Sequence, residues 1–405
     1  MYDFANSGYT TVVLTAVFNA YFVSVVAGNA EWATFAWTAA LSLSYAVVMV
    51  IGPILGASAD AHASKKRQLA VSTIVCIAGT VALAWSGPGD VTWTVACIVV
   101  SNVAYSMGEN LCAAFLPELS RPEALGRVSG WGWSWGYFGG IAALGACLAW
   151  VMTANARGST PGAAVAGTMV ITAAIYGIAA LPTFMWLKER AKPTGQAGGA
   201  RIAFERLMQT ARDARRYADL LLIFACGVFY QAGVATVVAL AAVYAEQVMG
   251  FKTEDTIELV IVVNVTAAIG AFAFGYAQDR IGKTMALRVT IVGWVAMVVI
   301  AYFSETRGSF WIAANLAGLC MGSSQSAGRA LVAYLAPADR SAEFFGLWGV
   351  AVRLAAILGP LSYGAVTWIT SGNHRLAILI TGVFFVLSLA ILAFVDERRG
   401  RSRVE

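Results

Sequence analysis

Long apolar runs alternate with short polar segments along the whole chain. A helix crosses the hydrocarbon core of a bilayer with about 20 apolar residues, and twelve runs reach that length. The predicted spans are residues 3–28, 33–59, 67–87, 91–117, 128–152, 162–187, 217–247, 255–278, 284–304, 309–335, 344–370 and 376–395. The pattern therefore predicts an all-α, polytopic membrane protein with twelve transmembrane helices.

The loops after the second and eighth predicted spans carry the same motif. A glycine is followed four residues later by an aspartate and then by basic residues, and the second copy begins 219 residues after the first. The two sets are Gly56, Asp60 and Lys65, and Gly275, Asp279, Arg280, Gly282 and Lys283. Internal repeats are typical of transporters whose related halves rock around a central site. We expect two pseudo-symmetric six-helix bundles.

The repeated loops also predict a conformational gate at the inner surface. Glycine lets two helices touch, and an aspartate can meet the positive end of a neighbouring helix, where basic residues clamp it. Contacts that form in one state and break in the other bias the equilibrium between the two states.

Polar composition divides the chain into bundles at residues 1–187 and 217–396, joined by a cytoplasmic linker at 188–216 and followed by a charged tail at 397–405. Within the linker, apolar residues fall at helical spacing while arginines occupy the other faces. This favours an amphipathic helix on the inner leaflet, although a solvated connector fits the same pattern. The apolar residues are Phe204, Leu207, Met208 and Ala211.

Composition sets the environment and the orientation. Hydrophobic residues make up 59% of the 405 residues and charged residues only 12%, with a mean hydropathy of +0.71, which excludes a soluble protein of this length. With both termini inside, the cytoplasmic segments hold 21 of the 27 Lys and Arg residues. We therefore expect a multi-pass protein of the cell membrane. The net charge of +5 favours anionic lipid headgroups at the inner face, and not nucleic acid, as partners.

Residue types that build cofactor or metal sites are scarce. The two histidines, His62 and His374, lie in predicted loops, and all six cysteines lie within apolar spans. Glycine-rich stretches lie inside spans and do not follow strands, which argues against a phosphate-binding loop. A cleaved signal peptide is not expected, because no Lys or Arg precedes Lys65. We expect no cofactor, no metal ion and no enzymatic activity.

Three charged residues, Glu109, Arg329 and Arg353, lie well away from the ends of predicted spans, where an unpaired charge is costly. Under the repeat offset Arg329 falls opposite Asn110, beside Glu109. A guanidinium suits a carboxylate or phosphate, so we expect Arg329 to anchor an anionic substrate, Arg353 to contact it, and Glu109 to tune binding or couple transport to protons. The alternatives are a structural Glu109–Arg329 pair and an Arg353 that extends to the inner surface.

Neutral polar side chains within the spans are further candidates for substrate contact. Asn and Gln in membrane helices also bond across helices, so each has a structural alternative. The candidates are Asn6, Tyr9, Asn110, Tyr230, Gln231 and Gln325. Asp3 and Glu343 lie at helix ends near the inner face, and we expect both to cap helix N-termini.

The doubled loop resembles the inner-loop motif of the major facilitator superfamily. Residues 2–9, 52–56, 130–140 and 340–347 are similar, more narrowly, to its vacuole-effluxer-like branch, which includes fungal vacuolar amino-acid exporters. The resemblance covers essentially the whole chain and implies alternating access and an amino-acid-like cargo. Ala61 and Ala63 depart from the loop motif, and no acidic residue adjoins Tyr230, which leaves Glu109 as the candidate for proton coupling.

The main hypothesis is a secondary transporter for a small, carboxylate-bearing solute. A multidrug exporter with an aromatic cavity built from Trp131, Trp135 and Tyr137 is a second hypothesis, and a non-transporting receptor or scaffold on a carrier fold is a third. Two related halves already enclose a pathway, so a monomer suffices.

Overall fold

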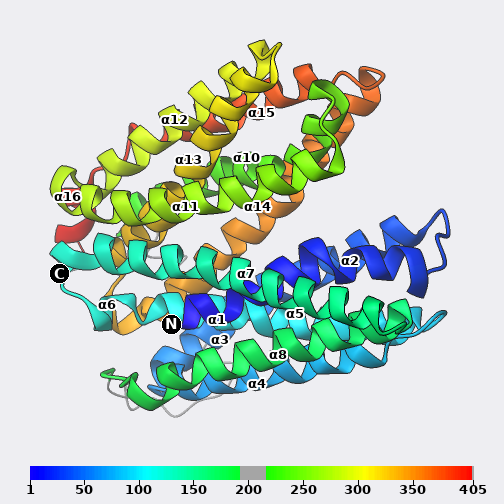
Figure 1. The fold of residues 1–405 in the computed structure, drawn as a ribbon. Helices are drawn as coiled ribbons and strands as arrows, with labels where there is room; N and C mark the ends of the chain where they lie inside the picture. The colour runs from blue at the N-terminus through cyan, green and yellow to red at the C-terminus, as the bar shows by residue number, and fades with distance from the viewer. Residues whose placement is uncertain (192–215, 404–405) are drawn as a thin grey trace.

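A computed structural model describes residues 1–191 and 216–403, and its secondary structure is helical throughout (Figure 1). The apolar residues Phe204, Leu207, Met208 and Ala211, and most of the predicted linker, lie outside the described residues. The interpretation of that segment as an amphipathic helix therefore stays a prediction.

The first half of the chain folds into six membrane-length segments. The first of them combines α-helical with π-helical turns, and its parts are α1 (Tyr2–Gly8), η1 (Tyr9–Ala16), α2 (Phe18–Tyr21) and η2 (Phe22–Val26). The others, with their short extensions, are α3 (Ala33–Ala61), α4 (Lys65–Ala82), η3 (Leu83–Trp85), α5 (Val91–Ala114), α6 (Leu116–Leu119), η4 (Pro122–Ala124), α7 (Leu125–Ala156) and α8 (Pro161–Trp186).

The second half repeats this plan and ends in a short helix. Its elements are α10 (Ala218–Met249), α11 (Thr253–Ile281), α12 (Lys283–Phe303), α13 (Arg307–Leu335), η5 (Ala338–Arg340), α14 (Ser341–Ile369), α15 (His374–Leu392) and α16 (Glu397–Ser402). Within the described residues, eleven segments are long and apolar enough to cross a membrane. The twelfth long helix, α13, is more polar, since it carries Asn315, Ser323, Ser324, Gln325, Ser326 and Arg329.

The π-helical turns of the first segment were not predicted. The amide of Val17 donates to the carbonyl of Val12, five residues earlier, at 3.0 Å. The hydroxyl of Thr15 donates across the same interval to the carbonyl of Thr10 at 2.9 Å. Such bonds widen the helical turn, and π turns within helices are frequent at functional sites.

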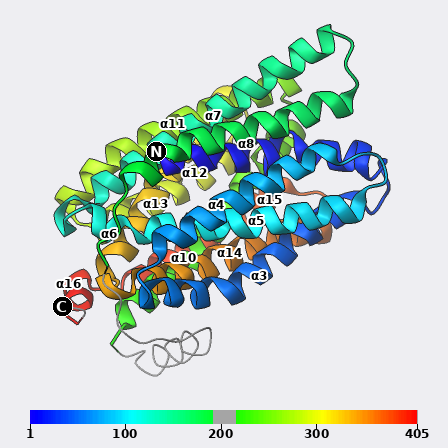
Figure 2. The same cartoon turned by 90° about the horizontal axis from the view of Figure 1, so that it is seen from below.

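The helices form two groups, α1–α8 and α10–α15, as the sequence predicts (Figure 1). They meet where α3 packs against α14 and α7 packs against α11. The groups lie close together at the end that carries α6 and α16 and diverge toward the opposite end (Figure 1). The view from below again shows α6 and α16 at one end of the molecule (Figure 2).

Glycines allow close backbone contact where the two bundles meet. A Cβ atom on Gly346 of α14 would lie 2.8 Å from the carbonyl oxygen of Gly52 on α3. At the other crossing, a Cβ atom on Gly130 of α7 would lie 2.8 Å from the Cα atom of Gly275 on α11. In lipid, such close contact is a main source of attraction between helices, because the hydrophobic effect does not drive them together.

Candidate functional site

The aspartate of the first repeated loop binds the start of a helix from the other bundle. The Asp60 carboxylate accepts the backbone N–H groups of Ala342, at 3.2 Å, and Glu343, at 2.8 Å, in the first turn of α14. The first turn of a helix carries unpaired N–H groups and a partial positive charge, so a carboxylate stabilises it. The residue next to this contact, Gly56, faces the carbonyl of Ala342, and a Cβ atom there would lie 2.2 Å from that oxygen.

The aspartate of the second loop makes the reciprocal contact. The Asp279 carboxylate accepts the backbone N–H groups of Gly126 and Arg127, both at 2.9 Å, in the first turn of α7. The neighbouring Gln278 donates to the carbonyl of Gly126 at 3.0 Å. Each bundle therefore supplies one carboxylate that caps one helix of the other bundle, on the same side of the molecule.

The basic residues of the two loops do not act alike. Lys65 is fully buried, with its ammonium 3.8 Å from Asp60 and in an ion pair with Glu118, as expected for a clamp. In the second loop the expected clamp is wrong, because Asp279 pairs with Arg127 at 3.6 Å, while the Lys283 ammonium lies over the Tyr334 ring, 4.6 Å from its centroid. Arg280 of the same loop is exposed. Gly282 follows the last residue of α11 and has a φ of +92°, a backbone conformation that favours glycine.

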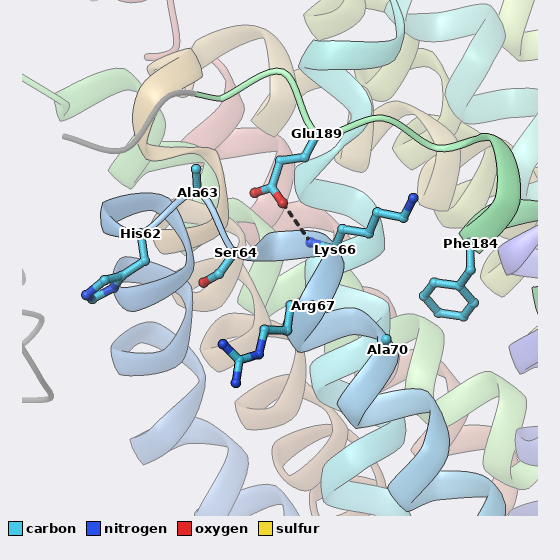
Figure 3. Close-up of a pocket in the computed structure, with 8 residues that line it drawn as sticks. All are labelled: His62, Ala63, Ser64, Lys66, Arg67, Ala70, Phe184 and Glu189. Atoms are coloured by element: carbon cyan, nitrogen blue, oxygen red, sulfur yellow. Dashed lines mark hydrogen bonds between the residues drawn. The ribbon is translucent and has the colours of Figure 1, made fainter. Parts of the chain in front are cut away.

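An open hollow of about 650 Å³ lies beside the first loop (Figure 3). Its lining is His62, Ala63, Ser64, Lys66, Arg67, Ala70, Phe184 and Glu189. The Glu189 carboxylate in it accepts the N–H groups of Lys65 and Lys66, at 2.8 and 3.1 Å, and so caps α4. Because this carboxylate already serves a helix start and the hollow is open, we do not place the substrate there.

Arg329 forms an ion pair across the two bundles, but with Asp3 and not with Glu109. One terminal nitrogen, Nη1, lies 2.9 Å from the Asp3 carboxylate. The other two nitrogens also donate between bundles, Nε to the Ser129 hydroxyl at 3.1 Å and Nη2 to the Ser129 carbonyl at 2.8 Å. Asp3 also lies in the first turn of α1, at a helix N-terminus as predicted, but its pairing with Arg329 was not predicted. The alternative of a Glu109–Arg329 pair is wrong. The repeat offset did not identify the partner of Arg329.

Gly132 makes room for this ion pair. A Cβ atom at position 132 of α7 would lie 2.2 Å from an Asp3 carboxylate oxygen and 2.5 Å from a terminal nitrogen of Arg329. Trp133, the next residue, lies under the Arg329 guanidinium, 5.4 Å away. Any side chain larger than hydrogen at position 132 therefore displaces the pair.

A second carboxylate–arginine pair joins the bundles. An Arg353 nitrogen of α14 lies 2.7 Å from the Glu109 carboxylate of α5, and the guanidinium lies 5.4 Å from the centre of the Tyr45 ring. The side chain of Arg353 is 11% exposed and that of Glu109 is 31% exposed. Arg353 does not extend to the inner surface, so that alternative is also wrong. In both pairs the first bundle supplies the acid and the second bundle supplies the arginine.

The neutral candidates lie in the cores of the bundles and at their contact; all are buried except Gln325, which is half-buried. Gln231 and Gln325 exchange two amide hydrogen bonds, at 2.8 and 3.1 Å, between α10 and α13. Tyr230 is fully buried beside them, and Asn110 fills the space in front of Gly349 of α14.

The other residues predicted to contact substrate or to cap a helix lie away from the two carboxylate–arginine pairs or bind local partners. Asn6 is buried, and the Tyr9 hydroxyl lies 2.7 Å from that of Ser101. Glu343, expected to cap a helix, lies in the first turn of α14 and binds Arg340 at 2.7 Å. Trp131 and Trp135, the candidates for an aromatic cavity, are 44% and 53% exposed, and the tryptophan in contact with a charged pair is instead Trp133.

Comparison with known proteins identifies the family. A model of the family described as "Vacuole effluxer Atg22 like" matches residues 15–126 and 123–405. The chain belongs to this family. An uncharacterized MFS-type transporter, YxiO of Bacillus subtilis (strain 168), is 30% identical over 403 residues, which are 98% of this chain and 94% of that protein. Autophagy-related protein 22 of Cryptococcus neoformans var. neoformans is 24% identical over 296 residues, which are 68% of this chain but 53% of the fungal protein.

Solved structures agree with the fold of this Atg22-like chain. The structure of the MFS proton:xylose symporter XylE bound to 6-bromo-6-deoxy-D-glucose matches with a TM-score of 0.75 at 15% identity, over 99% of this chain and 95% of that one. The fold is therefore that of the major facilitator superfamily, and the protein is an MFS transporter of the Atg22-like branch.

Sequence reasoning missed several residues that shape the site of this Atg22-like transporter. They are Ser129, Gly132, Tyr45, Glu118 and Arg127. Of these, Gly132 and Ser129 lie near the glycine-rich and tryptophan-rich stretch that supports the family resemblance, so that stretch carried a signal. Tyr45 had none, because an isolated tyrosine in a span has many possible roles.

Proposed function

We propose that this transporter moves a small, polar, carboxylate-bearing solute of the amino-acid type by rocker-switch alternating access. The observation that carries the proposal is the second carboxylate–arginine pair, Glu109–Arg353, which lies between the two bundles. A buried charge at such a position is costly unless it has a function or a partner, and arginine offers a planar set of donors that fits a carboxylate.

We assign the anchoring role to Arg353 in place of Arg329. All three nitrogens of Arg329 already donate, two of them to Ser129, which suits a residue that holds the bundles together. Within the described residues, the Arg353 guanidinium donates a hydrogen bond only to Glu109, whose side chain is the more exposed of the two. Asn110, Gln231 and Gln325 contribute the polar lining in this proposal, with Asn6, Tyr9 and Tyr230 supporting it from the core.

The aspartate caps support the rocking motion. The gate in this proposal consists of Asp60 and Asp279 with their glycines, and it is closed on the side of the repeated loops. We place that side, both termini and the anionic lipid headgroups at the cytoplasmic face of the cell membrane, with the protein acting as a monomer. Glu109 is the residue we propose for any coupling to protons.

Counterflow in reconstituted liposomes tests the proposal. Vesicles are preloaded with a mixture of amino acids and other small acids, and uptake of labelled compounds is measured with and without a pH gradient. We expect specific accumulation of a carboxylate-bearing solute that Arg353→Gln reduces at least tenfold, since one charge-assisted bond contributes about 1.5–3 kcal/mol. Accumulation of lipophilic cations alone would favour a drug exporter, and a folded protein that binds solutes without flux would indicate a receptor.

A further inference from the structure

The surroundings of Arg353 contain more hydrogen-bond donors than acceptors. The Nη2 atom binds Glu109 at 2.7 Å, while Nε is buried and has no hydrogen-bond partner within the described structure. The side-chain amide nitrogen of Asn110 is likewise buried and unpartnered there. Both residues are only 9% exposed. Buried donors of this kind are costly unless something accepts from them.

The two unpartnered donors lie along the same face of α14. A Cβ atom on Gly349 would lie 2.4 Å from the Asn110 amide nitrogen, so this amide sits directly in front of position 349. Residues four apart project from the same side of a helix, which places Arg353 one turn further along that face. An anion beside Arg353 thus has a guanidinium and a neighbouring amide from which to accept.

Glu109 is the more accessible member of its pair. Its side chain is 31% exposed against 11% for Arg353. The guanidinium has a second support, the Tyr45 ring at 5.4 Å, which remains when the carboxylate leaves. The pair therefore consists of a fixed cation and a more accessible anion.

The other pair is built differently. Asp3 is one of three acceptors around Arg329, and the other two are the hydroxyl and the carbonyl of Ser129. A solute that replaced Asp3 would gain the donor at Nη1, because Nε and Nη2 stay bonded to Ser129, whereas at Arg353 the Nε donor is also unpartnered within the described residues. The Asp3–Arg329 pair thus provides a chemically matched comparison for Glu109–Arg353.

We propose that Glu109 is an internal competitor for the substrate anion: it occupies Arg353 in the empty transporter, and the substrate carboxylate displaces it. This inference deepens the proposed function and rests on it, because it assumes that a carboxylate binds at Arg353. In the empty state the resident carboxylate neutralises the buried guanidinium, and in the loaded state the solute does so. Glu109 then acts as a positioning residue that sets affinity, and not as an anchor.

Ligand-induced stabilisation of the purified full-length protein tests this exchange without measuring flux. The probe is propionate, with propionamide as its uncharged counterpart, and the dissociation constant follows from the dependence of the unfolding temperature on ligand concentration. The variants are Glu109→Gln, which removes the competing charge, and Asp3→Asn, the same change in the other pair. Arg353→Lys keeps the positive charge but removes the planar set of donors.

Glu109→Gln is expected to bind propionate about tenfold more tightly than the parent, because a charged hydrogen bond no longer competes. Asp3→Asn leaves the affinity unchanged, Arg353→Lys weakens it, and propionamide stabilises none of the proteins. Unchanged or weaker binding by Glu109→Gln overturns the exchange while leaving the transport proposal intact. An equal gain in Asp3→Asn also overturns it, because the effect is then a general loosening of the bundles. If propionate stabilises none of the proteins and counterflow shows no carboxylate flux, the proposed function fails as well.

Discussion

Gly132 illustrates how one missing side chain positions two charges from different bundles. The Asp3 carboxylate and the Arg329 guanidinium meet in the space that a Cβ atom would occupy, 2.2 and 2.5 Å from its position. The same helix contains Gly145, where an added Cβ atom meets nothing within 4 Å. The two glycines therefore separate the effect of lost space from the effect of changed helix propensity.

Gly132→Ala is expected to lower the stability of the protein by about 1–3 kcal/mol, the usual cost of overpacking, because the ion pair must move apart. Gly145→Ala is expected to be neutral or slightly stabilising, since alanine favours the helix. Thermal unfolding of the detergent-purified variants measures both. Equal behaviour of the two variants would show that the pair does not depend on the space at position 132.

The pairing of charges shows where prediction from sequence stops at this scale. Hydropathy located Glu109, Arg329 and Arg353 inside spans, and the need for a partner followed from their burial. Which carboxylate each arginine meets depends on how far each helix is rotated and on which helices touch. For Asp3, the position near a helix end was visible in the sequence, but its ion pair with Arg329, 326 residues away, was not.

At the scale of helices, the crossing of α3 and α14 is one of the two places where the bundles pack together, and in the proposed mechanism it forms part of the gate. Gly56 lies against the carbonyl of Ala342, at a position where a Cβ atom would be 2.2 Å from the oxygen, and the backbone there cannot move aside as a side chain can. Gly364, on α14, has no atom within 4 Å of an added Cβ and provides the matched control.

Gly56→Ala is expected to separate the bundles at this face, because overpacking costs about 1–3 kcal/mol in the closed state and nothing in the open state. Spin labels at positions 62 and 280, both exposed, report the separation by double electron–electron resonance. The labelled parent with Gly364→Ala is expected to keep the parent distance distribution. A Gly56→Ala distribution identical to that of the parent would contradict the gate.

The helices themselves were the most predictable elements. Each predicted span agrees with an observed segment to within a few residues, because the length and the hydropathy of an apolar run determine where a membrane-spanning helix begins and ends. The π-helical turns of η1 and η2 were not predictable in this way, since a shift from i−4 to i−5 bonding leaves the apolar composition unchanged. The sequence predicted that Asp60 and Asp279 each meet the start of a neighbouring helix. It did not predict that these helices are α14 and α7 of the opposite bundle.

At the scale of the whole molecule, the distribution of basic residues predicts which side faces the cytoplasm. Arg398 lies in the C-terminal helix and Arg157 in the loop after α7, and both are exposed. In intact cells, a membrane-impermeant maleimide is expected to label Arg157→Cys, and to label Arg398→Cys only after permeabilisation. The unsubstituted protein is the control for labelling of the native cysteines, five of which are buried and one partly buried. The reverse pattern of labelling would invert the orientation.

In the proposed alternating-access cycle, the reciprocal helix caps have an energetic consequence. When the two bundles part, water replaces each carboxylate at the exposed N–H groups. Opening therefore costs only the difference in free energy between an N–H group bonded to a carboxylate and one bonded to water. One cap is worth about 1 kcal/mol, and the two together about 2 kcal/mol. A tenfold difference in solute concentration across a membrane stores about 1.4 kcal/mol. Because the caps form again when the bundles close, their free energy cancels over a complete cycle. In the proposed mechanism they therefore set the population of the closed state, and the solute gradient alone sets the direction of net transport.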